Sequence, residues 1–283
     1  MSLTVLALIM FAALLHATWN ALIKLGGDRL IIMALLSGSS GVIGLCLTPF
    51  FPLPAPAAWP FIAATSFIHI GYIWFLTKAY DHGDFGVVYP IARGVAPLLT
   101  ATGAMIFGGE FLNGTSLAGV AIIAAGIMSL AHDGSIRTGE GETRSLKPAL
   151  YALATGCFIA SYTLVDGFGV RVSGTVGGYT AWLFALHGLP LVIMVMFIRR
   201  DGLVLASRQN WKRGAVGGAF SIAAYWIVIW AFTLGAIAPV AALRETSVVF
   251  AAIFAAVHLR EGFGVRRGLS ALRVGSGIIL LAF

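Results

Sequence analysis

The chain has 283 residues, of which 59% are hydrophobic and only 10% charged, and its mean hydropathy is +0.94. A water-soluble domain carries about 25% charged residues, so this composition excludes a soluble globular protein and indicates a protein whose solvent is lipid. The formal net charge of +7 could suggest a nucleic-acid-binding protein. The basic residues, however, lie in short clusters between apolar runs without interleaved aromatic residues, so we expect no nucleic-acid partner.

Apolar runs long enough to cross a bilayer follow one another along the whole chain. A spanning helix needs about 20 mostly apolar residues. The first run is not preceded by basic residues and has no small-residue cleavage site, so it is interpreted as a transmembrane helix rather than a signal peptide. The sequence therefore predicts an all-α polytopic membrane protein with ten transmembrane helices, at 2–24, 30–51, 58–79, 85–108, 114–131, 148–166, 175–198, 212–234, 238–259 and 265–283.

A long polar segment, residues 132–147, divides the chain into two similar halves. Sliding one half over the other by 151 positions superposes charged residues: Arg93 with Arg244 and Glu110 with Glu261. We therefore predict two five-helix repeats, 1–131 and 148–283, joined by a polar linker. Because five is odd, the repeats would cross the membrane in opposite directions. Each glutamate ends an apolar run, and we expect it to bond backbone donors of the helix that follows.

Inverted repeats favour one class of membrane protein. In secondary transporters the substrate site commonly lies between such repeats, which rock to alternate access. No phosphate-binding P-loop, HExxH or GxSxG motif is present, so ATP-driven transport and the common membrane proteases find no support. The alternatives are a membrane-embedded enzyme acting on lipid, for which acidic, His and Cys residues are too scattered, and a receptor or structural protein. We expect no enzymatic activity, no cofactor and no metal, and we interpret Cys46 and Cys157 as membrane-buried thiols.

Charged residues inside the apolar runs are the first candidates for a substrate site, because such residues usually face the bundle interior. Arg93 and Arg244 hold matching places in the fourth and ninth helices, and a guanidinium can bind a carboxylate through two parallel hydrogen bonds. Glu245 should point about 100° away from Arg244 on a helix and so meet Arg93 across the repeat interface. Two interpretations stay open: an internal ion pair, or direct work on a substrate or proton.

Aromatic and polar side chains at helical spacing make up the rest of the candidate cavity. Residues three or four apart share a helix face, and aromatic walls with a few polar tips suit a mid-sized organic solute. This set comprises His16, Trp19, Asn20, His69, Tyr72, Tyr179, Trp182, Tyr225 and Trp226. The alternative is that these rings belong to interfacial belts or to packing. The histidines, with His187, could also carry protons near neutral pH.

The basic residues also predict an orientation in the membrane. Lys and Arg concentrate in the loops after the first, third, fifth, seventh and ninth helices, whereas the opposite side carries only Arg171. The positive-inside rule then places these loops in the cytoplasm and both termini outside.

The order of these features resembles the drug/metabolite transporter superfamily, specifically its ten-helix EamA-type members. The resemblance rests on the opening run Ala12–Ala21 and on two helix hairpins. In these an aromatic-rich helix ending in Ala79-Tyr80 or Ala231-Phe232 is followed by a helix that ends at Glu110 or Glu261. It spans essentially the whole chain, and the bacterial amino-acid exporters, including the aromatic type, are the closest match among members.

This resemblance implies a multi-pass protein of the cell membrane, the inner membrane in a Gram-negative bacterium. It implies export of amino acids or similar small molecules by alternating access, with another metabolite or a drug as the alternative solute. The implied partners are the small-molecule substrate and the lipid bilayer, with protons as a further candidate, and the protein is expected to be a monomer or weak oligomer. The superfamily's usual orientation has cytoplasmic termini, opposite to that given by the loop charges.

Overall fold

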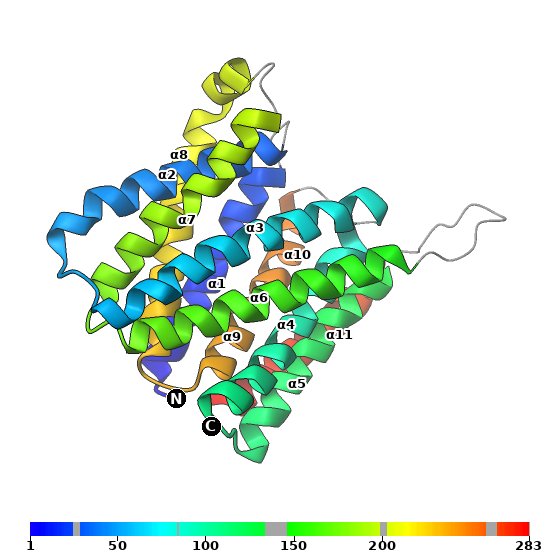
Figure 1. The fold of residues 1–283 in the computed structure, drawn as a ribbon. Helices are drawn as coiled ribbons and strands as arrows, with labels where there is room; N and C mark the ends of the chain where they lie inside the picture. The colour runs from blue at the N-terminus through cyan, green and yellow to red at the C-terminus, as the bar shows by residue number, and fades with distance from the viewer. Residues whose placement is uncertain (25–28, 84, 134–145, 199–202, 259–264, 283) are drawn as a thin grey trace, which may run out of the picture. The chain divides into compact units, whose positions relative to one another are not determined.

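The structure, a computed structural model, describes residues 1–24, 29–83, 85–133, 146–198, 203–258 and 265–282, and within these ranges it is helical without any strand (Figure 1). The helices are α1 (Leu3–Lys24), α2 (Arg29–Leu47), α3 (Trp59–His82), α4 (Phe85–Gly108), α5 (Gly114–Ser129), α6 (Lys147–Arg171), α7 (Val176–Ile198), α8 (Leu203–Phe232), α9 (Ile237–Glu245), α10 (Ser247–His258) and α11 (Val265–Ala282). Short 3₁₀ turns occupy Thr48–Phe50, Pro56–Ala58 and Leu130–Asp133.

These helices have the length and composition of membrane spans. Eight stretches of the described residues are long and apolar enough to cross a membrane, and the helices Gly114–Ser129 and Gly268–Ala282 are apolar but shorter. Large apolar side chains such as Phe107, Phe111 and Leu272 are exposed, as expected where the outer faces of helices contact lipid. The chain is an all-α polytopic membrane protein, and the predicted fold class is confirmed.

The predicted ninth helix is interrupted in the structure. Instead of one helix over 238–259, α9 ends at Glu245 and α10 begins at Ser247. At the junction, both the amide and the hydroxyl of Thr246 donate to the carbonyl of Leu243, at 3.2 and 2.6 Å. This tight turn replaces the regular bond to the residue four positions back, and such turns mark strained or hinge positions.

Two other helices are longer than predicted. α6 extends to Arg171 instead of stopping at 166, and α8 begins at Leu203 instead of 212. The additional turns contain charged residues. Asp166 in α6 is bound by two tyrosine hydroxyls, and Arg208 and Lys212 in α8 are exposed, so none of them ends its helix.

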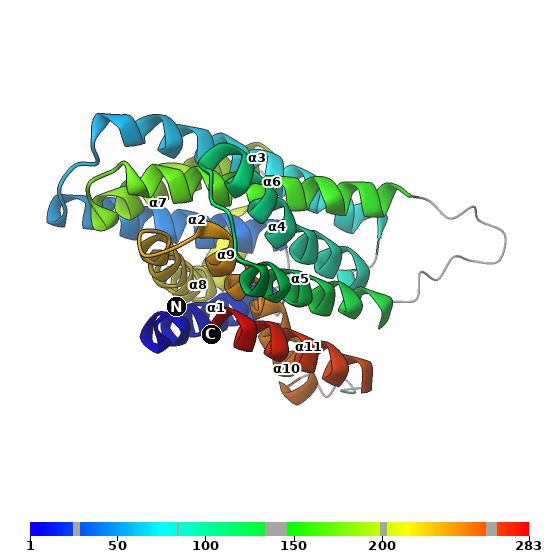
Figure 2. The same ribbon diagram turned by 90° about the horizontal axis from the view of Figure 1, so that it is seen from below.

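The helices form two compact units, and each unit combines helices from both halves of the sequence. The first comprises Met1–Leu6, Gly71–Leu164 and Ala236–Phe283. Within it α5 runs along α11, and α4 packs against α5 and α9 (Figure 2). A Cβ on Gly277 of α11 would come within 2.9 Å of the carbonyl oxygen of Gly119 on α5. Such close approach of backbones is what small residues permit at helix contacts in membranes.

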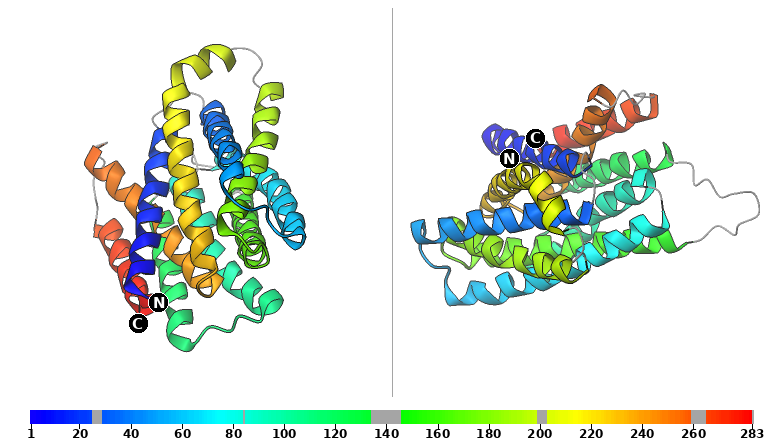
Figure 3. Two further views of the ribbon diagram at one scale, coloured as in Figure 1. Left: turned by 90° about the vertical axis from the view of Figure 1, so that its left-hand side faces the viewer. Right: turned by 90° about the horizontal axis from the view of Figure 1, so that it is seen from above.

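The second unit comprises Ala7–Ile70 and Val165–Gly235. Within it α2, drawn in blue, packs against both α7 and α8 (Figure 3). A Cβ on Gly44 of α2 would lie 2.8 Å from the carbonyl oxygen of Ala181 on α7, and one on Gly218 of α8 would lie 2.8 Å from the amide nitrogen of Ser40 on α2. Glycine therefore sets the spacing of α2 to both of its neighbours.

Candidate functional site

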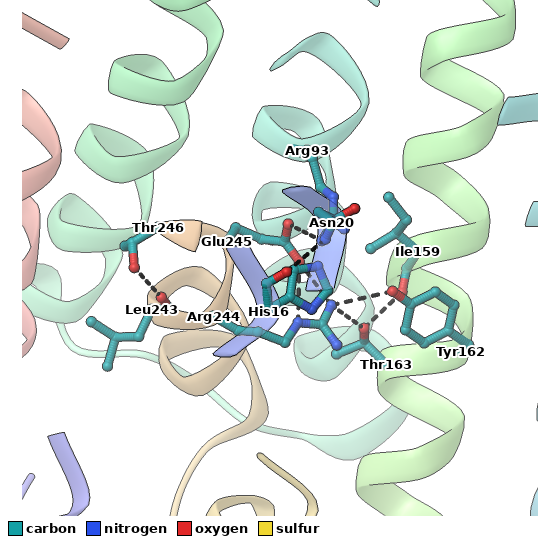
Figure 4. A network of polar contacts seen from close by, with 10 residues as sticks. All are labelled: His16, Asn20, Arg93, Ile159, Tyr162, Thr163, Leu243, Arg244, Glu245 and Thr246. Carbon is teal, nitrogen blue, oxygen red and sulfur yellow. Dashed lines mark hydrogen bonds and ion pairs between the residues drawn. The ribbon is translucent and has the colours of Figure 1, made fainter. Parts of the chain in front are cut away.

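A buried cluster of three charged residues lies in the first unit, at the point where α9 ends (Figure 4). Arg93 of α4 donates from Nη1 to Oε2 of Glu245 at 2.7 Å, and Arg244 donates from Nη2 to Oε1 at 2.8 Å. The side chains of all three are at most 3% exposed. Each oxygen of one carboxylate is thus bound by a different guanidinium, and the predicted contact between Arg93 and Glu245 is present.

The expectation that Glu245 points away from Arg244 is wrong. Arg244 also donates from Nε to the same oxygen of Glu245 at 3.2 Å. Helix geometry fixes the direction of a Cβ, whereas the guanidinium lies several flexible bonds further along the side chain. The guanidinium of Arg244 can therefore contact the carboxylate of Glu245, the next residue in the chain, at the end of α9.

Tyrosine rings surround the charge cluster. The guanidinium of Arg244 lies 5.5 Å from the ring centroid of Tyr162, and that of Arg93 lies 5.2 Å from the centroid of Tyr89. The ring of Tyr72 packs edge-on against Tyr162 with centroids 6.0 Å apart. A cation over an aromatic face is stabilised by the quadrupole of the ring, more strongly when water is excluded.

Arg244 also has polar contacts with α6. Its Nη2 donates to the hydroxyls of Tyr162 at 3.4 Å and Thr163 at 3.3 Å. Sequence reasoning selected Tyr72 but missed Tyr89, Tyr162 and Thr163. A signal for Tyr162 was available, because Ala160-Ser161-Tyr162 resembles Ala17-Thr18-Trp19, which contains a selected residue, at an offset of 143 positions instead of 151.

Glu110 ties the start of α9 to the end of α4. Its Oε2 accepts a hydrogen bond from the amide of Ile237, the first residue of α9, at 2.9 Å. The N-cap position of α9 is Ala236, whose side chain has no acceptor. A carboxylate here satisfies an otherwise unpaired helix amide and complements the positive end of the helix dipole. Glu110 thereby holds the helix that carries Arg244 and Glu245.

The expected role of the two helix-ending glutamates is corrected accordingly. The helix that follows Glu110 in the chain is α5, and it is capped by Asn113, whose side-chain oxygen accepts from the amide of Ser116 at 2.8 Å. Glu110 instead caps α9, a helix of the other half of the sequence. Glu261 lies outside the described residues.

In the second unit the selected histidines and tryptophans pair with other rings. His16 and Trp19 of α1 lie 4.6 Å apart between centroids, and Asn20 donates from Nδ2 to the carbonyl of His16 at 2.8 Å. His69 of α3 meets His187 of α7 at 4.7 Å. Trp182 packs on Trp59, and Trp226 on Phe51, each pair at 5.2 Å. The amide of Asn20 therefore bonds within its own helix, and the rings form pairs inside this unit.

The two selected tyrosines of the second unit meet on a carboxylate that sequence reasoning missed. Tyr179 of α7 and Tyr225 of α8 donate to the two oxygens of Asp166 on α6, at 3.2 and 2.6 Å. Asp166 is completely buried. It was missed because the expected helix stopped at 166, which made the residue look like a helix end at the water interface.

The candidate residues are thus divided between the two units. Arg93, Arg244, Glu245 and Tyr72 come together around Tyr162 in the first unit, and the other eight candidates belong to the second. Among the described residues, no group of three or more His, Cys, Asp or Glu side chains is arranged to hold a metal ion.

The fold defines an all-α polytopic membrane protein, and comparison with known proteins agrees with this class. A solved structure titled "Crystal structure of protein" has the same fold: it is 18% identical, the match covers 99% of this chain and 96% of that one, and the TM-score is 0.74. Residues 146–283, slightly less than half of the chain, are similar to the EamA-like transporter family. The search of curated proteins found no match.

Proposed function

We propose that this protein is a secondary membrane transporter that exports amino acids by alternating access. The observation that carries the proposal is the buried Arg93–Glu245–Arg244 cluster, located where α9 ends inside a membrane span. Interrupted transmembrane helices commonly form the substrate sites of secondary transporters. The similarity of residues 146–283 to the EamA-like transporter family supports the same class of function.

The charges of the cluster favour a solute that carries a carboxylate. Two arginines contribute +2 and one glutamate −1, so the three side chains together carry a net charge of +1. A carboxylate binds a guanidinium through two parallel, charge-assisted hydrogen bonds. The neighbouring rings of Tyr72, Tyr89 and Tyr162 would contact the apolar part of a mid-sized solute. An amino acid, including an aromatic one, meets both requirements.

Binding such a solute would require an exchange of partners. Both oxygens of Glu245 are already held by guanidinium groups, so an incoming carboxylate would replace Glu245 on one arginine. Arg244 bonds Glu245 through Nε and Nη2 and also contacts two hydroxyls of α6, whereas Arg93 bonds Glu245 through Nη1. The site would then have two states: one in which Glu245 binds both arginines, and one in which a substrate carboxylate replaces Glu245 on one of them.

Transport can be tested by reconstituting the purified protein in liposomes and measuring counterflow of radiolabelled phenylalanine. Arg244→Ala should reduce counterflow about tenfold or more, since hydrogen bonds to a charged partner contribute about 1.5–3 kcal/mol each. Arg273→Ala is the matched control, because Arg273 is an exposed arginine on α11. Absence of counterflow for a panel of amino acids would reject the solute class, and normal flux in Arg244→Ala would remove Arg244 from the site. Competition by an organic acid without an amino group would point to another metabolite.

The proposed location is the cell membrane, which in a Gram-negative bacterium is the inner membrane. The loop charges support an orientation with the linker 132–147 in the cytoplasm. In this orientation Glu110, which follows the fourth membrane span, lies on the external side together with the start of α9.

A further inference from the structure

The C-terminal half of α6 contains a buried carboxylate that the proposed solute site does not use. Asp166 is 0% exposed. Tyr179 donates to its Oδ1 at 3.2 Å from α7, and Tyr225 donates to its Oδ2 at 2.6 Å from α8. An ionisable side chain at membrane depth is costly and by default marks a pathway or a proton relay.

Gly169 of α6 leaves the space that Tyr179 occupies beside this carboxylate. Gly169 lies three residues after Asp166 on α6, and a Cβ there would come within 2.9 Å of Cε2 of Tyr179 and 2.6 Å of Cβ of Phe61. Tyr179 is itself completely buried. The hydrogen bond to Asp166 is therefore part of a close-packed contact in which a larger residue at 169 would displace the tyrosine.

Arg171 and His187 of this unit have contacts of their own. Arg171, five residues further along α6, donates to the carbonyl of Phe232 at the end of α8 and to that of Gly235 beyond it, at 2.8 and 2.6 Å. The ring of Phe184 lies between Tyr225 and His187, at 6.0 and 5.4 Å from their centroids. The His69–His187 pair is therefore one ring away from Tyr225. Two tyrosine hydroxyls, from α7 and α8, bond directly to the carboxylate.

We propose that Asp166 is a proton-binding site that couples transport to a proton gradient, an inference that rests on the proposed transport function. A proton from the aqueous phase forms an O–H bond with one carboxylate oxygen. The protonated group then donates to a tyrosine oxygen, and that tyrosine hydroxyl turns its own hydrogen to another acceptor. Protonation thus changes the bonding of α6 to α7 or α8 without leaving a charge in the membrane.

α6 itself connects this change to the solute site. Thr163, whose hydroxyl accepts from Arg244, precedes Asp166 by three residues, and residues at this spacing lie on one side of a helix about one turn apart. A rotation or shift of α6 on protonation of Asp166 therefore also moves a hydrogen-bond partner of Arg244. Proton binding and solute binding become coupled in both directions, as linkage requires.

The test compares the full-length protein and Asp166→Asn in liposomes containing pyranine, a fluorescent pH indicator. Radiolabelled phenylalanine is the probe, and both its accumulation under an imposed pH gradient and the associated proton movement are recorded. Asparagine keeps the size of the side chain but cannot bind the proton. We expect Asp166→Asn to keep phenylalanine counterflow and to lose gradient-driven accumulation by about tenfold or more, within the usual range of coupling between two sites. Asp81→Asn, at an exposed carboxylate of α3, is the matched control and should behave as wild type.

The outcomes separate this inference from the function on which it rests. If wild-type counterflow is present but neither accumulation nor pyranine responds to the gradient, transport stands and the proton site is rejected. Gradient-driven accumulation by Asp166→Asn at the wild-type level rejects it as well.

Should Asp166→Asn fail to fold, Tyr225→Phe keeps the carboxylate and removes one donor. This variant should shift the pH at which flux is half-maximal upward, because the charged form loses a hydrogen bond. An unshifted pH profile would reject the proposal.

Discussion

At the scale of single residues, one carboxylate holds two arginines together. Glu245 neutralises one of the two positive charges of Arg93 and Arg244 in a cluster that is at most 3% exposed. Breaking a buried ion pair by removing one partner costs far more than replacing the whole pair, because the remaining charge stays buried. This asymmetry makes the contribution of Glu245 to stability measurable without knowing the solute.

Glu245→Leu alone should lower the free energy of unfolding by about 3–5 kcal/mol, since it leaves two buried guanidinium groups without their carboxylate. The double variant Arg93→Leu/Glu245→Leu should be less destabilised, because one of those charges is removed as well. Thermal unfolding of the purified protein in detergent measures both. A double variant that unfolds at a lower temperature than the single one would contradict this account of the cluster.

Glu110 caps α9 and Asn113 caps α5, and we expect the loss of these two caps to affect phenylalanine binding differently. Glu110→Ala and Asn113→Ala should each destabilise the protein by about 1 kcal/mol, the usual cost of removing an N-cap side chain. Only Glu110→Ala should also weaken phenylalanine binding, because only α9 carries Arg244 and Glu245. Equal binding by both variants, measured by counterflow at several phenylalanine concentrations, would show that the cap does not position the site.

The charged residues of the cluster could be predicted from sequence because a charge inside an apolar run is conspicuous. Arg93, Arg244 and Glu245 are of this kind. Asp166 could not be found in this way, because it stands close to Arg171 and the two together resemble a helix end. Its burial depends on tertiary contacts that the local sequence does not indicate. Two tyrosine hydroxyls, 13 and 59 residues further along the chain, donate to its carboxylate oxygens.

At the scale of elements, the interruption between α9 and α10 has no local sequence signal. The stretch Leu243-Arg244-Glu245-Thr246-Ser247 contains neither proline nor glycine, the usual breakers of helices. The turn is made by hydrogen bonds of Thr246 to Leu243, and the residue before it is held by Arg93 on another helix. α4, which carries Arg93 at the other end of this contact, is continuous and has the predicted bounds 85–108.

Contact between α2 and α7 depends on glycine at particular positions. A Cβ on Gly44 would meet backbone atoms of Ala181 and Ala185 at 2.8 and 2.9 Å, whereas one on Gly275 of α11 meets nothing within 4 Å. Gly44→Ala should therefore destabilise the protein by about 1–3 kcal/mol through overpacking. Gly275→Ala should be neutral or slightly stabilising, because alanine favours the helix by about 0.5–1 kcal/mol. Equal melting temperatures of the two variants in detergent would contradict this description of the contact.

At the scale of the whole molecule, helices that occupy equivalent places in the two predicted repeats pack against each other. α2 contacts α7 in one unit, and α4 contacts α9 and α5 contacts α11 in the other. The register that superposes Arg93 on Arg244 makes these same helices equivalent. This pairing agrees with a duplicated chain, and the repeat itself stays a prediction.

The loop charges predict which side of the membrane each loop occupies. A reporter protein that is active only in the cytoplasm should be active when fused within the linker 132–147 and inactive when fused after Leu112, between the fourth and fifth membrane helices. The reason is that the linker carries several basic residues and the loop at Leu112 carries none. The reverse pattern would contradict the orientation given by the loop charges and would place both termini in the cytoplasm.

Counterflow of radiolabelled phenylalanine through liposomes containing the wild-type protein, Arg244→Ala or Arg273→Ala shows whether the buried arginine cluster serves a solute site. We expect saturable counterflow for the wild-type protein and for Arg273→Ala, and a loss of about tenfold or more for Arg244→Ala with the protein still folded. Undiminished counterflow in Arg244→Ala, or equal loss in both variants, would contradict this expectation.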